Sequence, residues 1–76
     1  MTRLKWIKAG NEYVAGPIIA RRDKYIVIIS VPKFDVYVYS KKKKLEFKAK
    51  SLRAAKILAK KELIKLGARF YDEVRN

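Results

Sequence analysis

Alternating hydrophobic and polar residues in the first part of the chain predict short β-strands. Residues 3–8 (RLKWIK) alternate before the polar residues 10–12, which indicates a short first strand followed by a turn. A second strand is expected over residues 13–22. The Gly-Pro pair at 16–17 interrupts this strand and predicts a bulge or a sheet edge, because proline cannot donate a hydrogen bond to a sheet ladder.

Residues 25–31 (YIVIISV) are the most strand-like segment of the chain. A tight turn at residues 23–24 is expected to lead into them, and Pro32 ends the run. The segment is an almost continuous row of β-branched residues, which is typical of a central strand that is covered on both faces.

The next two segments predict a hairpin. Residues 36–40 alternate valine and tyrosine, and residues 45–50 (LEFKAK) alternate again after four consecutive lysines. We therefore expect the four lysines to form the loop of the hairpin. If the aliphatic side chains face the core, Tyr37 and Tyr39 share the outer face of the sheet with lysines.

From Ser51 onward the hydrophobic period becomes that of a helix. Ser51 has the chemistry of an N-cap, and Gly67 has that of a C-terminal stop. A stripe of apolar residues follows one face of this helix and is expected to pack on the sheet. Its members are Leu52, Ala55, Ala59, Leu63, Leu66 and Phe70.

The predicted fold class is α+β. We expect a single domain over residues 1–76, in which a small antiparallel meander of three to five strands (about residues 3–50) packs against one C-terminal helix (about residues 51–67). The tail at 68–76 extends the helix, forms a last turn or frays.

The chain lacks the residue types on which most small active sites depend. Its 76 residues include no cysteine and no histidine, which excludes disulfides and removes the usual zinc ligands and the commonest general base. The seven acidic residues are scattered, and the three glycines form no phosphate-binding loop. We therefore expect no catalytic residue, no metal, no cofactor and no enzymatic activity.

Hydrophobic segments of the chain are short. No apolar run resembles a signal peptide, and no window reaches the roughly 18 residues of a membrane span. A soluble, cytoplasmic protein without a membrane partner is therefore expected. The absence of glutamine and the abundance of lysine, isoleucine and valine favour a thermophilic, for instance archaeal, source.

Positive charge is the main functional signal. Twenty lysines and arginines against seven acids give a net charge of +13, and residues 41–61 hold ten of the basic residues with Glu46 as their only acid. A field of this sign attracts phosphate-rich partners, so DNA or RNA is the expected partner. Lysine outnumbers arginine by 14 to 6, which favours point-charge contacts to phosphate over base readout and predicts low sequence specificity.

Three features within this region predict phosphate or base contacts. Cations crowd the start of the helix, where a helix normally carries acids, which suggests an external phosphate, although a solvated basic face is the alternative. The lysine loop is either a clamp beside this helix start or a solubilising hairpin tip. The tyrosines either stack on unpaired bases or are ordinary half-buried strand residues. The predicted nucleic-acid-binding residues are Lys41, Lys42, Lys43, Lys44, Lys48, Lys50, Arg53, Lys56, Tyr37 and Tyr39.

A second apolar line runs along the helix at seven-residue intervals. Ile57, Ile64 and Tyr71 lie on a helix face separate from the main stripe. A lone helix on one sheet does not need this line. Either the N-terminal segment folds over it, or it forms a contact between two copies of the chain in a homodimer.

The segment SLRAAKILAKKELIKLG (residues 51–67) resembles the last helix of double-stranded-RNA-binding domains. The matching residues are Ser51, Arg53, Ala55, Lys56, Ala59, Leu63 and Leu66. The resemblance covers about the C-terminal half and implies that Arg53 and Lys56 grip phosphates across a groove. The resemblance does not extend to the N-terminal part of the chain, because that family begins with a helix whereas this chain begins with predicted strands.

The order of three strands and a helix is similar to the small DNA-binding domains of integrase N-termini and plant ethylene-response factors. The shared local features are the pair Ala54-Ala55 and the KLG ending at residues 65–67. Those domains lay the sheet into the major groove. This resemblance implies that the outer-face residues Tyr37, Tyr39, Lys48 and Lys50 read the DNA.

Two alternatives use the same basic surface. The first alternative is a small regulator or inhibitor, of the kind found in phages and viruses, that binds an acidic protein surface. The second is a ribosome-associated protein with a structured RNA partner. A specific protein complex includes a hydrophobic contact and persists as salt rises, whereas nonspecific nucleic-acid binding collapses. Salt dependence therefore separates the classes.

Overall fold

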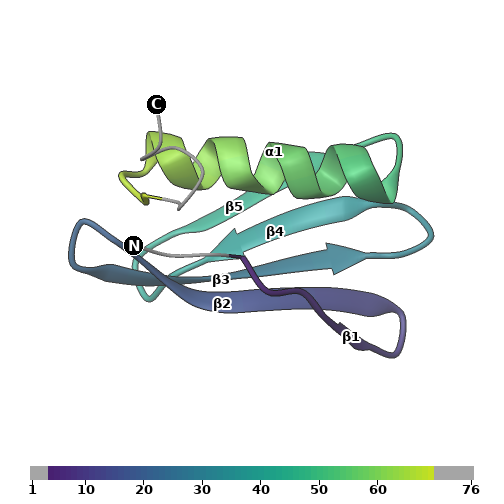
Figure 1. Ribbon diagram of the computed structural model, residues 1–76, viewed down its shortest axis with the longest axis horizontal. Helices are drawn as coiled ribbons and strands as arrows, with labels where there is room; N and C mark the ends of the chain where they lie inside the picture. Colours follow the sequence, from purple (N-terminus) through teal and green to yellow (C-terminus); the bar gives the residue numbers. More distant parts are fainter. Residues whose placement is uncertain (1–3, 70–76) are drawn as a thin grey trace.

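The computed structural model describes residues 4–69, which form an antiparallel sheet of five strands beneath one helix (Figure 1). The strands follow their sequence order across the sheet, so the topology is a meander. This confirms the predicted α+β class. The elements are β1 (Ile7–Ala9), β2 (Glu12–Ala20), β3 (Asp23–Ser30), β4 (Asp35–Tyr39), β5 (Lys44–Lys48) and α1 (Leu52–Lys65).

Strand β2 carries the predicted bulge. Its pairing with β3 shifts register between Ala15 and Ile18, around the Gly-Pro pair. Gly16 has a φ of +130°, and a Cβ there would lie 2.8 Å from the carbonyl oxygen of Tyr25, so only glycine fits this close approach. β1 pairs with β2 only at residues 12–14, so Pro17 lies beyond the end of that ladder and costs it no hydrogen bond.

The core lies between one face of the sheet and the inner face of α1. Alternation in β3 and β4 turns the paired residues Val27 and Val38 toward the helix, and both are fully buried. On α1 the buried residues are Ala55, Ala59 and Leu63, and the two alanines let the helix backbone approach the sheet closely. The predicted helix stripe is thus confirmed for its described members, while Phe70 lies outside the described residues.

Both ends of α1 are capped as predicted. The Oγ of Ser51 accepts a hydrogen bond from the amide of Ala54 at 3.1 Å. At the other end Gly67 has a φ of +108°, and the amides of Gly67 and Ala68 donate to the carbonyls of Ile64 and Leu63. This pair of bonds is a Schellman motif, which explains why the helix stops at Lys65.

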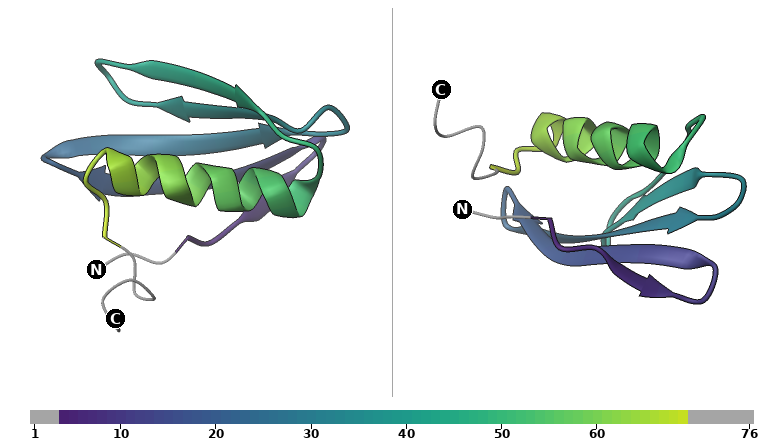
Figure 2. Two further views of the ribbon diagram at one scale, coloured as in Figure 1. Left: turned by 90° about the horizontal axis from the view of Figure 1, so that it is seen from above. Right: turned by 45° about the vertical axis from the view of Figure 1, so that its right-hand side comes forward.

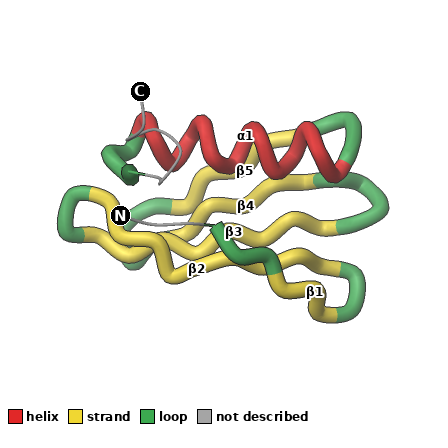
Figure 3. Tube along the Cα trace, in the orientation of Figure 1, coloured by secondary structure: helices red, strands yellow, loops and turns green. Residues whose placement is uncertain are grey.

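Only one face of the sheet is covered by an element of residues 4–69 (Figures 2 and 3). β3 is central, as predicted, but the prediction that it is covered on both faces is wrong for the single chain. On the face away from α1, Ile26 is 44 % exposed and Ile28 is half-buried. We call this surface the open face.

Candidate nucleic-acid interface

Two of the predicted phosphate ligands lie together at the start of α1. Lys50 and Arg53 flank the Ser51 cap, and both are exposed. The first turn contains no acidic residue. Within residues 4–69 the amides of Leu52 and Arg53 donate to no protein group, so this end offers positive partial charge and two cations to an anion.

Lys56, another predicted phosphate ligand, lies over two aromatic rings. Its ammonium lies 5.8 Å from the ring centroid of Trp6 and 5.3 Å from that of Tyr13, and the side chain is half-buried. These are cation–π distances. Lys56 therefore links α1 to Trp6 in the N-terminal segment and to Tyr13 in β2, and it also lines a hollow with Arg53.

Lys48 lies on the opposite side of the sheet from α1. It pairs with Asp35 across β4 and β5, while its neighbour Phe47 packs against the core. Successive strand residues point to opposite faces, so a residue one place from Phe47 cannot share the helix side. Of the four cations predicted at the helix start, Lys48 therefore lies elsewhere, whereas Lys50 and Arg53 flank the cap and Lys56 follows in the next turn of α1.

The lysine loop is ordered and lies at the other end of the molecule. Ser40 closes it: the Ser40 Oγ accepts hydrogen bonds from the amides of Lys42 (3.1 Å) and Lys43 (3.0 Å), and the Ser40 amide donates to the carbonyl of Lys43. Lys44 already belongs to β5. β5 carries the chain away from this loop before α1 begins and runs back (Figure 1). The loop therefore faces the C-terminal end of α1, and the predicted clamp of loop and helix start is wrong.

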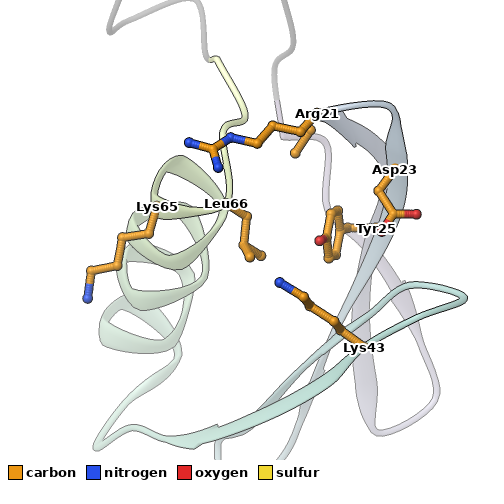
Figure 4. A pocket seen from close by; sticks show the side chains of 7 residues that line it. Arg21, Asp23, Tyr25, Lys43, Lys65 and Leu66 are labelled. Carbon is orange, nitrogen blue, oxygen red and sulfur yellow. The ribbon is translucent and has the colours of Figure 1, made fainter.

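A small cavity of about 260 Å³ marks this second basic end. Figure 4 shows the ammonium of Lys43 directed toward Tyr25 and Leu66, while the side chain of Lys65 points away from the cavity. The Lys65 ammonium instead pairs with the carboxylate of Glu62 at 3.2 Å. The lining residues are Ala20, Arg21, Asp23, Tyr25, Lys43, Lys65 and Leu66.

Sequence analysis missed Arg21 and Arg22 as members of this basic end. They form the two-residue turn between β2 and β3, two places earlier in the chain than the predicted turn at 23–24. Their φ angles are +49° and +70°, the left-handed values that a type I′ turn requires and that arginine rarely adopts. The signal available in the sequence was the Arg-Arg pair itself, placed where Asn-Gly is the usual choice.

The outer side of α1 joins the two basic ends. The helix carries five cations and one acid, and the acid is the Glu62 that pairs with Lys65. Ile57 and Ile64 lie among these cations and are 53 % and 36 % exposed, so the N-terminal part of residues 4–69 does not cover them. Tyr71, the third member of that predicted line, lies outside the described residues. The cations are Arg53, Lys56, Lys60, Lys61 and Lys65.

Tyr37 and Tyr39 lie on the open face, as predicted. Their rings are stacked with centroids 6.1 Å apart, and the ammonium of Lys44 lies 5.7 Å from the Tyr39 ring centroid. Partial burial and the carboxylates of Asp35 and Glu46 raise the pKa of the Tyr37 phenol. Tyr37 therefore lies beside two carboxylates, in contrast to Tyr39, which lies beside Lys44.

Searches of protein-family models, curated proteins and solved structures found no match to this chain. Within residues 4–69, no helix is long and apolar enough to cross a membrane. The same residues contain no group of three or more acidic side chains placed to hold a metal ion.

Proposed function

We propose that the protein binds nucleic acid through phosphate contacts made by the outer side of α1 and the two basic ends beside it. The observation that carries this proposal is the segregation of charge. Helix α1 carries five cations and one acid, Glu62, which pairs with Lys65. Asp23, at the cavity of the second basic end, is the other described acid on this side. The remaining three described carboxylates, those of Glu12, Asp35 and Glu46, lie on the open face. A surface on which cations outnumber acids in this way favours a polyanionic partner.

The length of this surface sets the expected number of contacts. An α-helix of 14 residues is about 21 Å long. One strand of B-form DNA presents a phosphate about every 3.4 Å, so the surface spans roughly six phosphates. A duplex bound along it should therefore show a steep salt dependence, with a log–log slope of about −5.

Low sequence specificity follows from the residue types on this surface. Four of the five helix cations are lysines, and Arg53 is the only arginine among them. Lysine acts on phosphate as a point charge, whereas base recognition in the major groove favours the two-pronged contact of arginine. The protein is thus expected to discriminate nucleic-acid form more than sequence.

An acidic protein surface is the second candidate partner, and one observation favours it. Ile57 and Ile64 are exposed between the helix cations. Apolar residues within a charged rim are typical of a protein–protein interface. Such a complex would keep its stoichiometry as salt rises, whereas binding to phosphates would weaken steeply.

The test is a salt series of fluorescence-anisotropy titrations with matched single- and double-stranded DNA and RNA. The variant Arg53→Ala/Lys61→Ala removes two exposed cations of the helix side. It is expected to reduce the slope on duplex DNA by nearly two, since each phosphate contact contributes about 0.9.

The matched control removes the same charge elsewhere. Lys5 and Lys8 are exposed on the N-terminal segment and the β1 edge, away from the outer side of α1. The variant Lys5→Ala/Lys8→Ala should change the slope much less. Equal losses from both pairs would mean that only net charge matters, and absence of binding at low salt would direct the search to an acidic protein.

A further inference from the structure

The open face is an apolar surface that the single chain leaves bare. One row across all five strands consists of Ile7, Val14, Ile28, Tyr37 and Glu46, so four of its five members are apolar or aromatic. Ile7 is 68 % exposed and Ile26, in the next row, is 44 % exposed. Ile19 adds a third exposed isoleucine, at 60 %. Monomeric proteins rarely expose such a continuous group of large apolar side chains.

The composition of β3 indicates that this face is normally covered. Ile26 and Ile28 alternate with the fully buried Val27 and Ile29, so the strand is aliphatic on both of its sides. A sheet with one solvated face usually alternates hydrophobic and polar residues, whereas a continuous aliphatic run is typical of a strand buried twice.

Charges on the open face are balanced and sorted along the strands. The carboxylates of Glu12 and Asp35 lie at the end of the face near the β3–β4 turn, where Lys48 pairs with Asp35, and Glu46 lies in the middle of β5. Lys24 and Lys44 lie toward the other end, next to Ile19 and Tyr39. Together with Lys48 the face carries three acids and three lysines, in a chain whose net charge is +13.

We propose that a second copy of the chain packs its open face against this one, related by a two-fold axis that runs across the strands. That rotation reverses the strand direction, so it sets the carboxylate end of one copy over the lysine end of the other. It also lays β5 on the β5 of the partner, which brings each Glu46 near a Lys44 of the other chain.

Charge decides between a second copy and nucleic acid as the occupant of the open face. A phosphate backbone would meet the carboxylates around Tyr37, which already raise the pKa of that phenol. Another copy would bring lysines to these carboxylates, whereas the cationic outer side of α1 would repel a second copy. The dimer differs from one built on Ile57 and Ile64, because both helices remain on its outer sides.

The first test is the association state by sedimentation equilibrium, from micromolar to submillimolar concentrations. The native chain is expected to dimerise. Ile26→Glu places a charge in the apolar centre, at a side chain already 44 % exposed in the single chain, and should weaken the dimer by about 30-fold or more. A matched change on the helix, Ile57→Glu, should leave the dimer intact, and circular dichroism checks that both variants fold.

The second test uses charge exchange on β5 and does not disturb the apolar centre. Glu46→Lys and Lys44→Glu should each weaken the homodimer by about tenfold, because a two-fold interface repeats every substitution. An equimolar mixture of the two variants should form a mixed dimer, and the double exchange in one chain should restore self-association.

Three results would overturn the proposal. The native chain could remain a monomer over the whole concentration range. Ile57→Glu could dissociate a dimer that Ile26→Glu leaves intact, which would move the interface to the helix. Finally, the mixture of Glu46→Lys and Lys44→Glu chains could associate no better than either alone, which would exclude this two-fold arrangement.

Discussion

The two faces of the sheet differ in the charge and the apolar surface that they expose. On the helix side the apolar residues of the sheet are buried beneath α1, and the exposed surface is mainly cationic. Its two described acids are Glu62, which is paired to Lys65, and Asp23 at the second basic end. On the open face the charges balance, and exposed isoleucines are what remains. The comparison shows that one small domain can place most of its excess positive charge on one side and three of its five exposed isoleucines on the other.

The largest expected effect concerns the inner side of α1. Leu63 is fully buried against the sheet, whereas Ile64, the next residue, is 36 % exposed on the outer side. Leu63→Ala should lower the free energy of unfolding by about 2–5 kcal/mol, and Ile64→Ala by about 0.5 kcal/mol or less. Urea denaturation measures both. Similar losses would show that the outer side is also packed, and the contrast between the sides would fail.

A smaller and opposite effect is expected at the basic turn between β2 and β3. Arg22 has a φ of +70°, which strains arginine but suits glycine. Arg22→Gly should therefore raise the free energy of unfolding by about 0.5–1 kcal/mol. Strained residues of this kind are often kept at functional sites, where they lower stability.

The same substitution should reduce the salt slope of duplex binding by about one if Arg22 contacts a phosphate. Arg22→Lys keeps both the charge and the strain, so it should change neither quantity appreciably. A glycine variant that is more stable and binds with an unchanged slope would remove this turn from the nucleic-acid surface.

The smallest effect concerns the electrostatics of the open face. The pKa of Tyr37 is raised from its ordinary value of 10.0 by partial burial, followed by Asp35 and Glu46. Glu46→Gln removes one carboxylate and should lower the pKa of Tyr37 toward that value, as followed by NMR of the ring carbon. Glu62→Gln on the helix side should leave it unchanged.

The raised pKa also has a consequence for stability. At pH values below the ordinary pKa of tyrosine, Tyr37 is protonated in both the folded and the unfolded chain. In that range Tyr37 adds no pH dependence to the free energy of unfolding. Above that pKa the unfolded chain releases its proton first, and the contribution of Tyr37 to stability falls as the pH rises. In Glu46→Gln this alkaline loss should be smaller, whereas an equal loss would show that the carboxylate is not a cause.

Local patterns predicted most of the fold. Alternation located the strands, and the chemistry of Ser51 and Gly67 set the ends of the helix, because caps and turns depend on neighbouring residues. The covering of β3 was beyond such reasoning. An aliphatic strand shows that two faces should be buried, but not whether the second cover comes from the same chain.

The candidate site was harder to predict because the face and the end on which each residue lies depend on where the chain turns between strands and helix. Lys48 and Lys50 are close in sequence, yet the first lies in β5 on the open face and the second follows the strand at the helix start. The lysine loop and the helix start lie at opposite ends of the domain, since β5 separates them. Arg21 and Arg22 depended on the register of the β2–β3 pair, which the bulge shifts.

The most direct test of the charge separation is an NMR titration of the labelled protein with a short DNA duplex. The account predicts that amide shifts change along the outer side of α1, at the Ser40–Lys43 turn and at Arg21 and Arg22. Signals of Ile28 and Tyr37 on the open face should respond to protein concentration and not to DNA. Saturable DNA-dependent shifts centred on Ile28 and Tyr37, with the helix unaffected, would contradict the account.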